Sequence, residues 1–379
     1  EGAVALSVRA QNIRAEPGEI WFEYTPGDGP VGIVISETDP KGTGNYIREI
    51  SVVREAHIEL FEVGAIFNPD WIAVVEDLRS VRFMDWMFTN AATVDTWESR
   101  PKPTDYTYAW RGSPVEVMVA LANQTGADPW FNMPHIATDT YMRQFAVYVQ
   151  ANLEPGLKAY VEYSNELWNF LFPQAGWAQE QARARWGASA GDDAWLQYSG
   201  LRAAEMAAIW AEVFGAEADD RLIRVIATHT GWPGFEESLL EAPLWMAETP
   251  RPQAPPSAYF DAYAVTGYFG HEYGSERLSE VLRWIAQSKD KAVAAASKLG
   301  LSSAAKINYV AAHKFDLATV ELVEDLKRQG LSELLTELWP YHAKVAATYG
   351  FDLVMYEGGT HIVGLGEATN NDELTEFFN

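Results

Sequence analysis

Apolar residues in the first 66 positions occur in short runs separated by turn-forming residues, a pattern typical of β-strands. Pro-Gly pairs at 17–18 and 26–27 and a glycine-rich segment at 41–44 punctuate these runs. The runs cover residues 4–8, 20–24, 31–35, 50–53 and 57–61. The sequence therefore predicts a small antiparallel β unit in residues 1–66, as an accessory module or a structural insert.

The pattern changes after residue 66, where apolar runs of strand length alternate with segments of helical periodicity. The runs after residue 80 that we interpret as strands cover residues 81–86, 128–133, 158–163, 222–227, 259–268 and 352–356. Strands that alternate with helices indicate βαβ units and a parallel sheet. We therefore predict an α/β chain in which residues 67–379 form a TIM barrel, the fold of eight alternating strands and helices.

The charge and composition of the chain argue against several classes of partner. The 53 acidic and 28 basic side chains give a formal net charge of −25, which would repel the phosphates of nucleic acids and anionic membranes. The chain has no cysteine, so disulfides and thiolate metal sites are excluded. No apolar run reaches the roughly 18 residues that a membrane-spanning helix needs. We expect neither a nucleic-acid nor a membrane partner.

Two glutamates lie at the ends of predicted strands. Glu166 follows the strand at 158–163 in the string Tyr-Ser-Asn-Glu, and Glu357 follows the strand at 352–356 in the string Tyr-Glu-Gly-Gly-Thr-His. The C-terminal ends of the strands form the active site of a TIM barrel, so both carboxylates would face the same cleft. Two carboxyl groups about 5–5.5 Å apart hydrolyse a glycosidic bond with retention of configuration. The pair therefore favours a glycoside hydrolase.

The order of these motifs resembles clan A of the retaining glycoside hydrolases. Asn165-Glu166 after one strand and Glu357 after a strand near the C-terminus carry the resemblance, over roughly residues 67–365. It implies that Glu166 is the general acid/base, that Glu357 is the nucleophile and that Asn165 binds the sugar 2-hydroxyl. It also implies that Tyr268, at the end of the preceding strand, orients the nucleophile. The longer strings also look like bacterial secreted proteins that are often labelled cellulose-binding, which implies a secreted protein.

The resemblance also numbers the strands. If residues 158–163 form strand four and residues 352–356 form strand seven, then residues 81–86 form strand two. Strand one would lie before or within residues 1–66, or be absent, and strand eight would follow residue 379. We therefore expect a barrel that lacks its last strand and a chain that is a segment of a longer protein. The alternative is that the strand count is wrong.

Further candidates for the site lie near the predicted strand ends. His135, His229 and His361 are candidates to bind sugar hydroxyls, and Arg82 is a candidate to keep the nucleophile ionised by charge pairing. Trp168 and Trp232 are candidates to stack on sugar rings. A structural role in the core remains an alternative for each of these side chains. The histidines do not follow a zinc-binding spacing, so we predict no metal and no cofactor.

We predict a secreted O-glycosyl hydrolase that cleaves a neutral β-linked polysaccharide, such as cellulose or another β-glucan, by double displacement. A glycosidase for another linkage, such as mannan, xylan or galactan, is one alternative. A non-catalytic carbohydrate-binding protein on the same scaffold is the second, and an unrelated α/β enzyme that uses these glutamates as metal ligands is the third. The sequence carries no signal for an oligomeric state.

Overall fold

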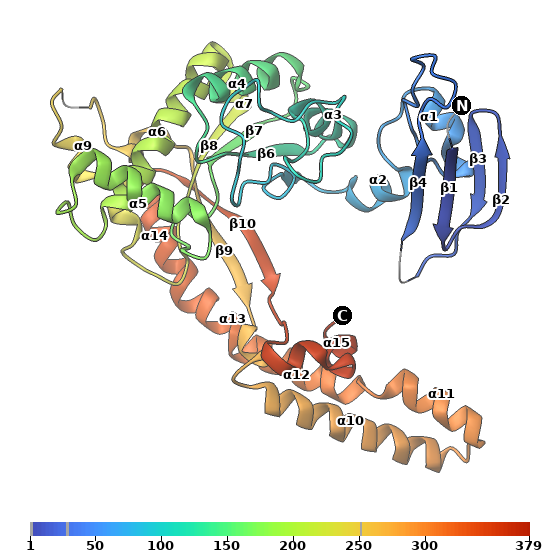
Figure 1. Cartoon of the computed structure of the whole chain (residues 1–379). Coiled ribbons are helices and arrows are strands. Elements are labelled where there is room, and N and C mark those ends of the chain that lie inside the picture. Colours follow the sequence, from blue (N-terminus) through green and yellow to red (C-terminus); the bar gives the residue numbers. More distant parts are fainter. Residues whose placement is uncertain (1–2, 28–29, 251) are drawn as a thin grey trace. The chain divides into compact units, whose positions relative to one another are not determined.

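The computed structural model describes residues 3–27, 30–250 and 252–379 (Figure 1). It divides into two compact units, residues 1–71 and residues 72–379.

The first unit contains two small antiparallel sheets. Strand β1 (Ala3–Val8) pairs with β4 (Val31–Glu37), and β2 (Gln11–Glu16) pairs with β3 (Glu19–Glu23). The expected antiparallel β unit is therefore confirmed. Its predicted end is wrong, because residues 57–61 are helical rather than extended. They belong to η1 (Glu55–His57) and α1 (Ile58–Glu62), and Gly64 follows this helix with a positive φ of 88°.

The second unit is built around a parallel sheet. Within the described residues the sheet has six strands in the order β10-β9-β8-β7-β6-β5, and every neighbouring pair is parallel. The strands are β5 (Ser80–Arg82), β6 (Asp128–Met133), β7 (Ala159–Tyr163), β8 (Leu222–Ala227), β9 (Ala262–Phe269) and β10 (Asp352–Thr360). The α/β class and the parallel sheet are confirmed, whereas no described strand pairs with the outer edges of β5 and β10, so an eight-stranded barrel is not formed by these residues.

The sheet curves strongly, because side chains from its two edge strands meet. Arg82 at the end of β5 contacts Glu357 on β10 at 2.7 Å, although four strands lie between them in the sheet. Aromatic and small side chains fill the concave face. Trp130 and Tyr356 are buried there with Ala262 and Ala264, whose small side chains leave room for the rings. The sheet is thus a nearly closed barrel with its interior filled.

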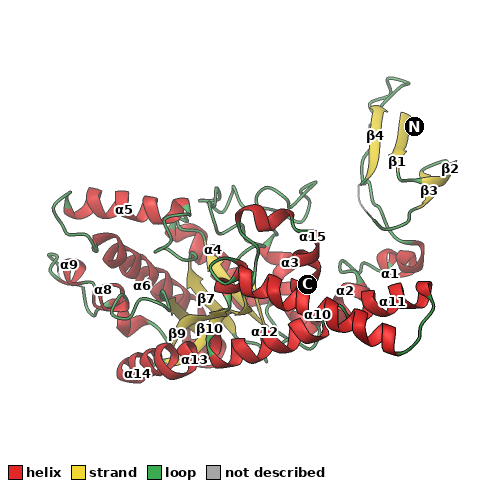
Figure 2. Ribbon diagram, turned by 90° about the horizontal axis from the view of Figure 1, so that it is seen from below, coloured by secondary structure: helices red, strands yellow, loops and turns green. Residues whose placement is uncertain are grey.

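Helices cover the convex face of the strands (Figures 1 and 2). Phe131 of β6 packs against Phe145 and Trp210 from two of these helices, with ring centroids 5.2 and 6.2 Å away. Helix α2 (Pro69–Val75) contains the boundary between the two units. The helices after it, which include those of the extension described next, are α3 (Val115–Thr125), α4 (Asp139–Asn152), α5 (Pro173–Trp186), α6 (Ala194–Phe214), α7 (Ala218–Arg221), α8 (Glu236–Glu241), α9 (Pro243–Met246), α10 (Leu278–Lys298), α11 (Ser303–His313), α12 (Asp316–Arg328), α13 (Gly330–Glu333), α14 (Trp339–Tyr349) and α15 (Asp372–Phe378).

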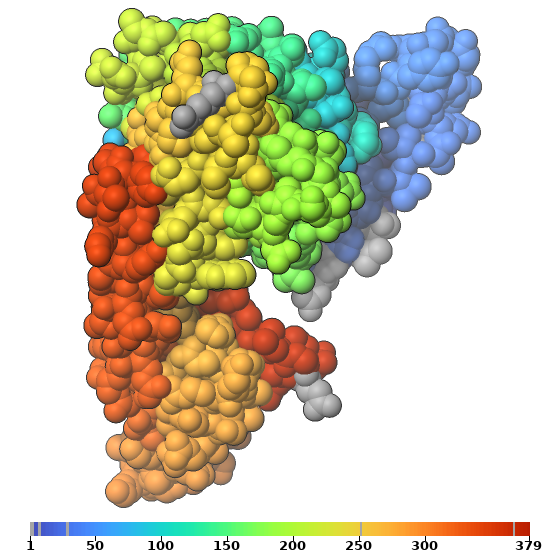
Figure 3. Space-filling model, turned by 90° about the vertical axis from the view of Figure 1, so that its left-hand side faces the viewer, coloured from blue at the N-terminus to red at the C-terminus, as the bar shows by residue number. Residues whose placement is uncertain are grey.

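Helices α10, α11, α12 and α15 form a helical extension after β9. In Figure 3 the orange segment that contains α10 protrudes from the rest of the second unit. Tyr273, Trp284, Ile285 and Leu374 bury its own small core. An ion pair between the buried Asp325 and the partly buried Arg277 ties α12 to the residue just before α10. No helix among the described residues is both long and apolar enough to cross a membrane.

The close packing of α6 on α8 depends on Gly200. A Cβ atom at that position would lie 2.0 Å from the carbonyl oxygen of Leu239 in α8. We expect Gly200→Ala to lower the free energy of unfolding by about 1–3 kcal/mol, because the helices must move apart. Gly176→Ala is the matched control on α5, where a Cβ meets no atom, and should raise it by about 0.5–1 kcal/mol. Denaturant titrations measure both values, and equal effects of the two substitutions would contradict this packing.

Candidate functional site

The loop after β7 holds Asn165 and Glu166 in a strained backbone. Ser164 and Glu166 have positive φ angles of 60° and 41°, which non-glycine residues rarely adopt. Side chains of the surrounding structure hold this conformation. Asn165 donates to the side chain of Asn90 at 3.1 Å, and Gln174 of α5 donates to the backbone carbonyl of Asn165 at 2.9 Å. Strain of this kind persists where many contacts fix it, and it is common at functional sites.

Arg82 connects three segments of the concave face. Its guanidinium donates to both oxygens of Glu162, to Glu357 at 2.7 Å and to the side-chain oxygen of Asn165 at 2.9 Å. Its charge also lies over the ring of Tyr356, 4.9 Å from the centroid. Burial lowers the pKa of Arg82, but the charges of Glu162 and Glu357 outweigh that effect and leave the pKa above its ordinary value. Arg82 is therefore a permanent cation between two carboxylates.

Glu162 is the buried anchor of this arrangement. Only 3% of the residue is exposed, and its carboxylate accepts hydrogen bonds from Trp130 at 2.9 Å and Asn132 at 2.8 Å besides those from Arg82. Asn132 also donates to the backbone carbonyl of Ser164 at 2.9 Å, which links the anchor to the strained loop. A buried ion pair with its remaining hydrogen bonds satisfied fixes a geometry, and removing one partner costs about 3–5 kcal/mol.

A β-bulge in β10 turns Glu357 toward Arg82. The pairing register of β10 with β9 shifts between Met355 and Glu357, so Tyr356 is the extra residue. Successive side chains of a regular strand point to opposite faces, whereas the bulge lets Tyr356 and Glu357 both reach Arg82. Tyr268 at the end of β9 donates to the second oxygen of Glu357 at 2.8 Å. Burial and this carboxylate raise the pKa of Tyr268 to about 12, so its phenol stays a hydrogen-bond donor at neutral pH.

Glu166 is tied to the same strand as Glu357. The hydroxyl of Tyr356, the residue before Glu357, donates to one oxygen of Glu166 at 3.0 Å. Asn169 donates to its other oxygen at 3.0 Å. Burial, followed by the charge of Glu166, raises the pKa of Tyr356 above its ordinary value, so this phenol also remains protonated. Glu166 and Glu357 are both only partly buried, and a ligand can therefore reach them from solvent.

Aromatic side chains flank the two glutamates. Trp168 contacts the ring of Tyr356 at 6.4 Å and that of His229 at 6.5 Å, and His229 contacts Trp232 at 6.3 Å. On the other side, His361 lies 5.1 Å from the ring of Tyr268. Trp232 is 60% exposed and Tyr268 is 40% exposed, so their rings are open to a ligand.

His135 is the sequence-predicted site residue that lies apart from this group. The residue is 5% exposed, and its ring packs edge-on against Trp177 of α5, with centroids 5.2 Å apart. Tyr163 donates to its backbone carbonyl at 2.6 Å. Burial lowers the pKa of His135 to about 4, so the imidazole is neutral at pH 7. None of the contacts described for the Arg82 network involves its side chain.

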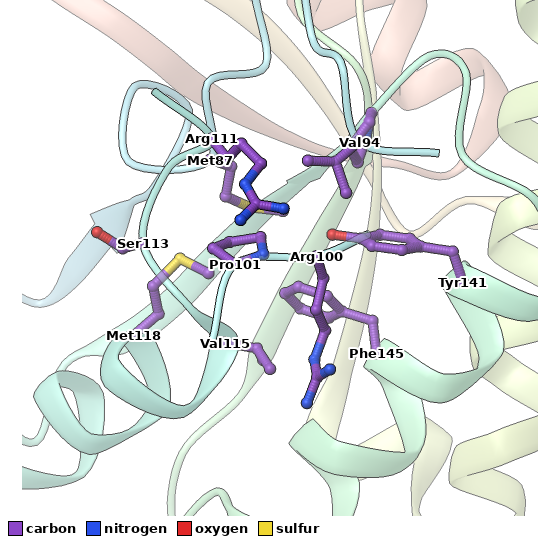
Figure 4. Close-up of a pocket in the computed structure, with 11 residues that line it drawn as sticks. Met87, Val94, Arg100, Pro101, Arg111, Ser113, Val115, Met118, Tyr141 and Phe145 are labelled. Carbon is purple, nitrogen blue, oxygen red and sulfur yellow. The ribbon is translucent and has the colours of Figure 1, made fainter. Parts of the chain in front are cut away.

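A small cavity behind β6 is distinct from the glutamate site. Arg100, Arg111 and Tyr141 are among the side chains that line it (Figure 4). Its volume of about 10 Å³ is enough for one water molecule. The Nε atoms of both arginines are buried without a hydrogen-bond partner among the described residues, which fits a buried water rather than a ligand.

Five polar side chains of the site were not identified from the sequence. Glu162 and Asn132 lie inside apolar strands, and a polar residue in such a strand is the signal that marks a buried partner. Tyr356 lies in a predicted strand and does not differ in pattern from its neighbours. Its partner, Glu166, is 190 positions away in the sequence. Asn90 and Gln174 hold Asn165 from other segments of the chain, so no motif identifies them.

Other proteins offer no direct guide to the site. Comparisons with models of protein families, with curated proteins and with solved structures gave no match. Within the described residues, no group of three or more His, Asp or Glu side chains is arranged to hold a metal ion. The positions and partners of its own side chains are therefore the basis for assigning a chemistry to the site.

The neutral state of His135 predicts acid sensitivity. Its folded-state pKa of about 4 lies below the ordinary value of 6.5, so the unfolded chain binds a proton in this window that the folded chain does not. The stabilisation is full above pH 6.5 and is lost as the pH falls toward 4, by about 2–3 kcal/mol. We expect the unfolding free energy of His135→Gln to fall less steeply over this range. Parallel slopes for the two proteins would contradict a neutral buried imidazole.

Proposed function

We propose that residues 72–379 hydrolyse a glycosidic bond with retention of configuration, with Glu357 as the nucleophile and Glu166 as the general acid/base. One observation carries this proposal. Glu357 is held by Arg82 and Tyr268, while Glu166 is held by Tyr356, the residue directly before Glu357. Among the described residues the carboxylate of Glu357 is paired with a cation and that of Glu166 with neutral donors, and a nucleophile and an acid require different environments of this kind.

In the first step, Glu166 donates its proton to the oxygen of the leaving sugar as the bond from the anomeric carbon to that oxygen breaks. An oxygen of Glu357 forms a bond to the anomeric carbon, which gives a glycosyl ester. The guanidinium of Arg82, 2.7 Å from Glu357, holds the carboxylate in place for this attack. The hydrogen bond from Tyr268 fixes the direction of the attacking carboxylate.

In the second step, water attacks the anomeric carbon and Glu166 accepts the proton of that water. The bond to Glu357 breaks, and the carboxylate returns to Arg82 and Tyr268. Two inversions at one carbon give net retention. Asn169 and Tyr356 keep Glu166 at the position where it serves both steps.

The surroundings of the pair favour a neutral polysaccharide as the substrate. Exposed rings such as Trp232 and Tyr268 offer apolar faces to sugar rings, and the net charge of −25 disfavours a strongly anionic polymer. A β-linked glucan such as cellulose is our first choice. A polymeric substrate of this kind would be met outside the cell, so the proposal includes secretion of the protein.

The open sheet edges give a second candidate function some support. Within the described residues the sheet has six strands rather than eight, and a site at its end would be less enclosed than in a complete barrel. A non-catalytic carbohydrate-binding protein would still use the exposed rings. Such a protein would not depend on the carboxylates of Glu166 and Glu357.

Substitution of the two glutamates tests the proposal. We expect Glu166→Gln and Glu357→Gln to lower the rate of reducing-sugar release from neutral β-glycans by about 10²–10⁴-fold, since each removes a group that acts in the transition state. The panel contains β-glucan, xylan, mannan and galactan. Glu154→Gln, an exposed glutamate in the loop after α4, is the matched control and should leave the rate unchanged.

The outcomes separate the alternatives. Release that survives both substitutions would contradict the assigned roles. Binding of a glycan without hydrolysis by the wild-type protein would favour the non-catalytic function. Hydrolysis that a chelator abolishes would indicate a metal-dependent reaction instead.

A further inference from the structure

A larger pocket lies on the outer side of the sheet, between the loop after β6 and the helices α5 and α6. Its volume is about 340 Å³, within the range of small-molecule sites. The side chains that define its chemistry are His135, Trp177, Arg185, Tyr198, Arg202 and Glu205. None of them belongs to the network of Arg82, Glu162, Glu166 and Glu357.

Edge-to-face aromatic contacts build one wall of this pocket. The ring of Trp177 contacts His135 at 5.2 Å and Tyr198 at 5.9 Å, both in edge-to-face geometry. The ring of Tyr198 also contacts the ring of Trp186, with centroids 6.2 Å apart. Trp177 remains partly exposed while its neighbours are buried. A rigid indole with an accessible surface is suited to stack on a sugar ring.

The charged side chains of the pocket are paired with each other or with residues just outside it. Arg185 makes two hydrogen bonds to Glu248, at 2.7 and 2.8 Å. Arg202 pairs with Glu205 and, at 3.0 Å, with Asp139. Two cations thus face three carboxylates, so the pocket has no excess positive charge to attract an anion. Fixed N–H donors beside carboxylate acceptors instead suit a ligand with many hydroxyl groups.

His135 supplies an observation that is independent of the aromatic wall. Its Nδ1 atom is buried and has no hydrogen-bond partner among the described residues. Most buried polar atoms in native proteins are hydrogen-bonded, to protein, water or ligand. A buried water would complete the hydrogen bonding of this imidazole and fix the ring of His135 against Trp177.

We propose that this pocket binds one neutral sugar unit, as a second carbohydrate site apart from the glutamate pair. The indole of Trp177 stacks on the pyranose ring, and the Arg185, Arg202 and Glu205 side chains bind its hydroxyls. The ligand class rests on the proposed function, because the sugar would be a unit of the same neutral polysaccharide. Tyr163, which holds the backbone of His135, precedes the loop with Asn165 and Glu166, so both sites lie near the end of β7.

Calorimetric titration of the full chain tests this site. The Glu357→Gln variant serves as the background, so that β-1,4-linked gluco-, xylo- and manno-hexasaccharides are not consumed. In this background we expect Trp177→Ala to weaken binding at one site by roughly five- to tenfold, the value of a lost aromatic contact. Trp110→Ala removes a more exposed indole, 54% exposed, outside both sites and should change nothing. Arg185→Gln, at the rim, should weaken binding less than Trp177→Ala and gives a second reading if that variant does not fold.

Failure of this proposal is distinguishable from failure of the proposed function. Unchanged binding in both Trp177→Ala and Arg185→Gln would overturn the second site, even if the wild-type protein hydrolyses the glycan. Weakened binding in these variants would support the site, even if the wild-type protein hydrolyses nothing. Tighter binding of a uronic-acid hexasaccharide than of every neutral one would overturn the assignment of a neutral ligand.

Discussion

The guanidinium of Arg82 is the constraint on which the rest of the concave face depends. It lies at the end of one edge strand, β5, and binds Glu357 on the other edge strand, β10. It also donates hydrogen bonds to Glu162 on β7, in the middle of the sheet. The sheet must curve for the contact with Glu357 to form, and small residues such as Ala262 and Ala264 permit the curvature. The charge of Arg82 is buried among two carboxylates and two aromatic rings, and these residues form one set. Removing one partner of a buried ion pair destabilises the folded state, because the other charge is left unpaired. The set therefore defines both the shape of the sheet and the position of Glu357.

Two departures from regular backbone place the glutamates on this framework. The positive φ angles of Ser164 and Glu166 turn the chain sharply after β7, and the bulge at Tyr356 brings two consecutive side chains to one face of β10. Both departures are held by hydrogen bonds to the same group of residues. Local strain and the buried ion pair are thus parts of one arrangement, which gives Glu357 a cation and leaves Glu166 with neutral donors.

The sequence predicted the parts of this arrangement that depend on local pattern. The apolar runs at 128–133 and 222–227 match β6 and β8, because buried strands need continuous apolar residues. The strand expected at 81–86 ends at Arg82, since only Val81 and Arg82 of that range pair with β6 and the chain then turns. Glu162 and Glu166 look alike in sequence, and only the contact with Arg82, 80 positions away, distinguishes the buried anchor from the accessible acid. Contacts of such separation leave no local signal.

Trapping of the covalent intermediate tests the role of Glu357 most directly. The wild-type chain would be incubated with a 2-deoxy-2-fluoro glycoside of the sugar that it releases, and its peptides analysed by mass spectrometry. We predict one added glycosyl group, located on Glu357 and absent from Glu357→Gln. A glycosyl group on Glu166 or on any other residue, or hydrolysis with inverted configuration and no adduct, would contradict the assignment of Glu357 as the nucleophile held by Arg82.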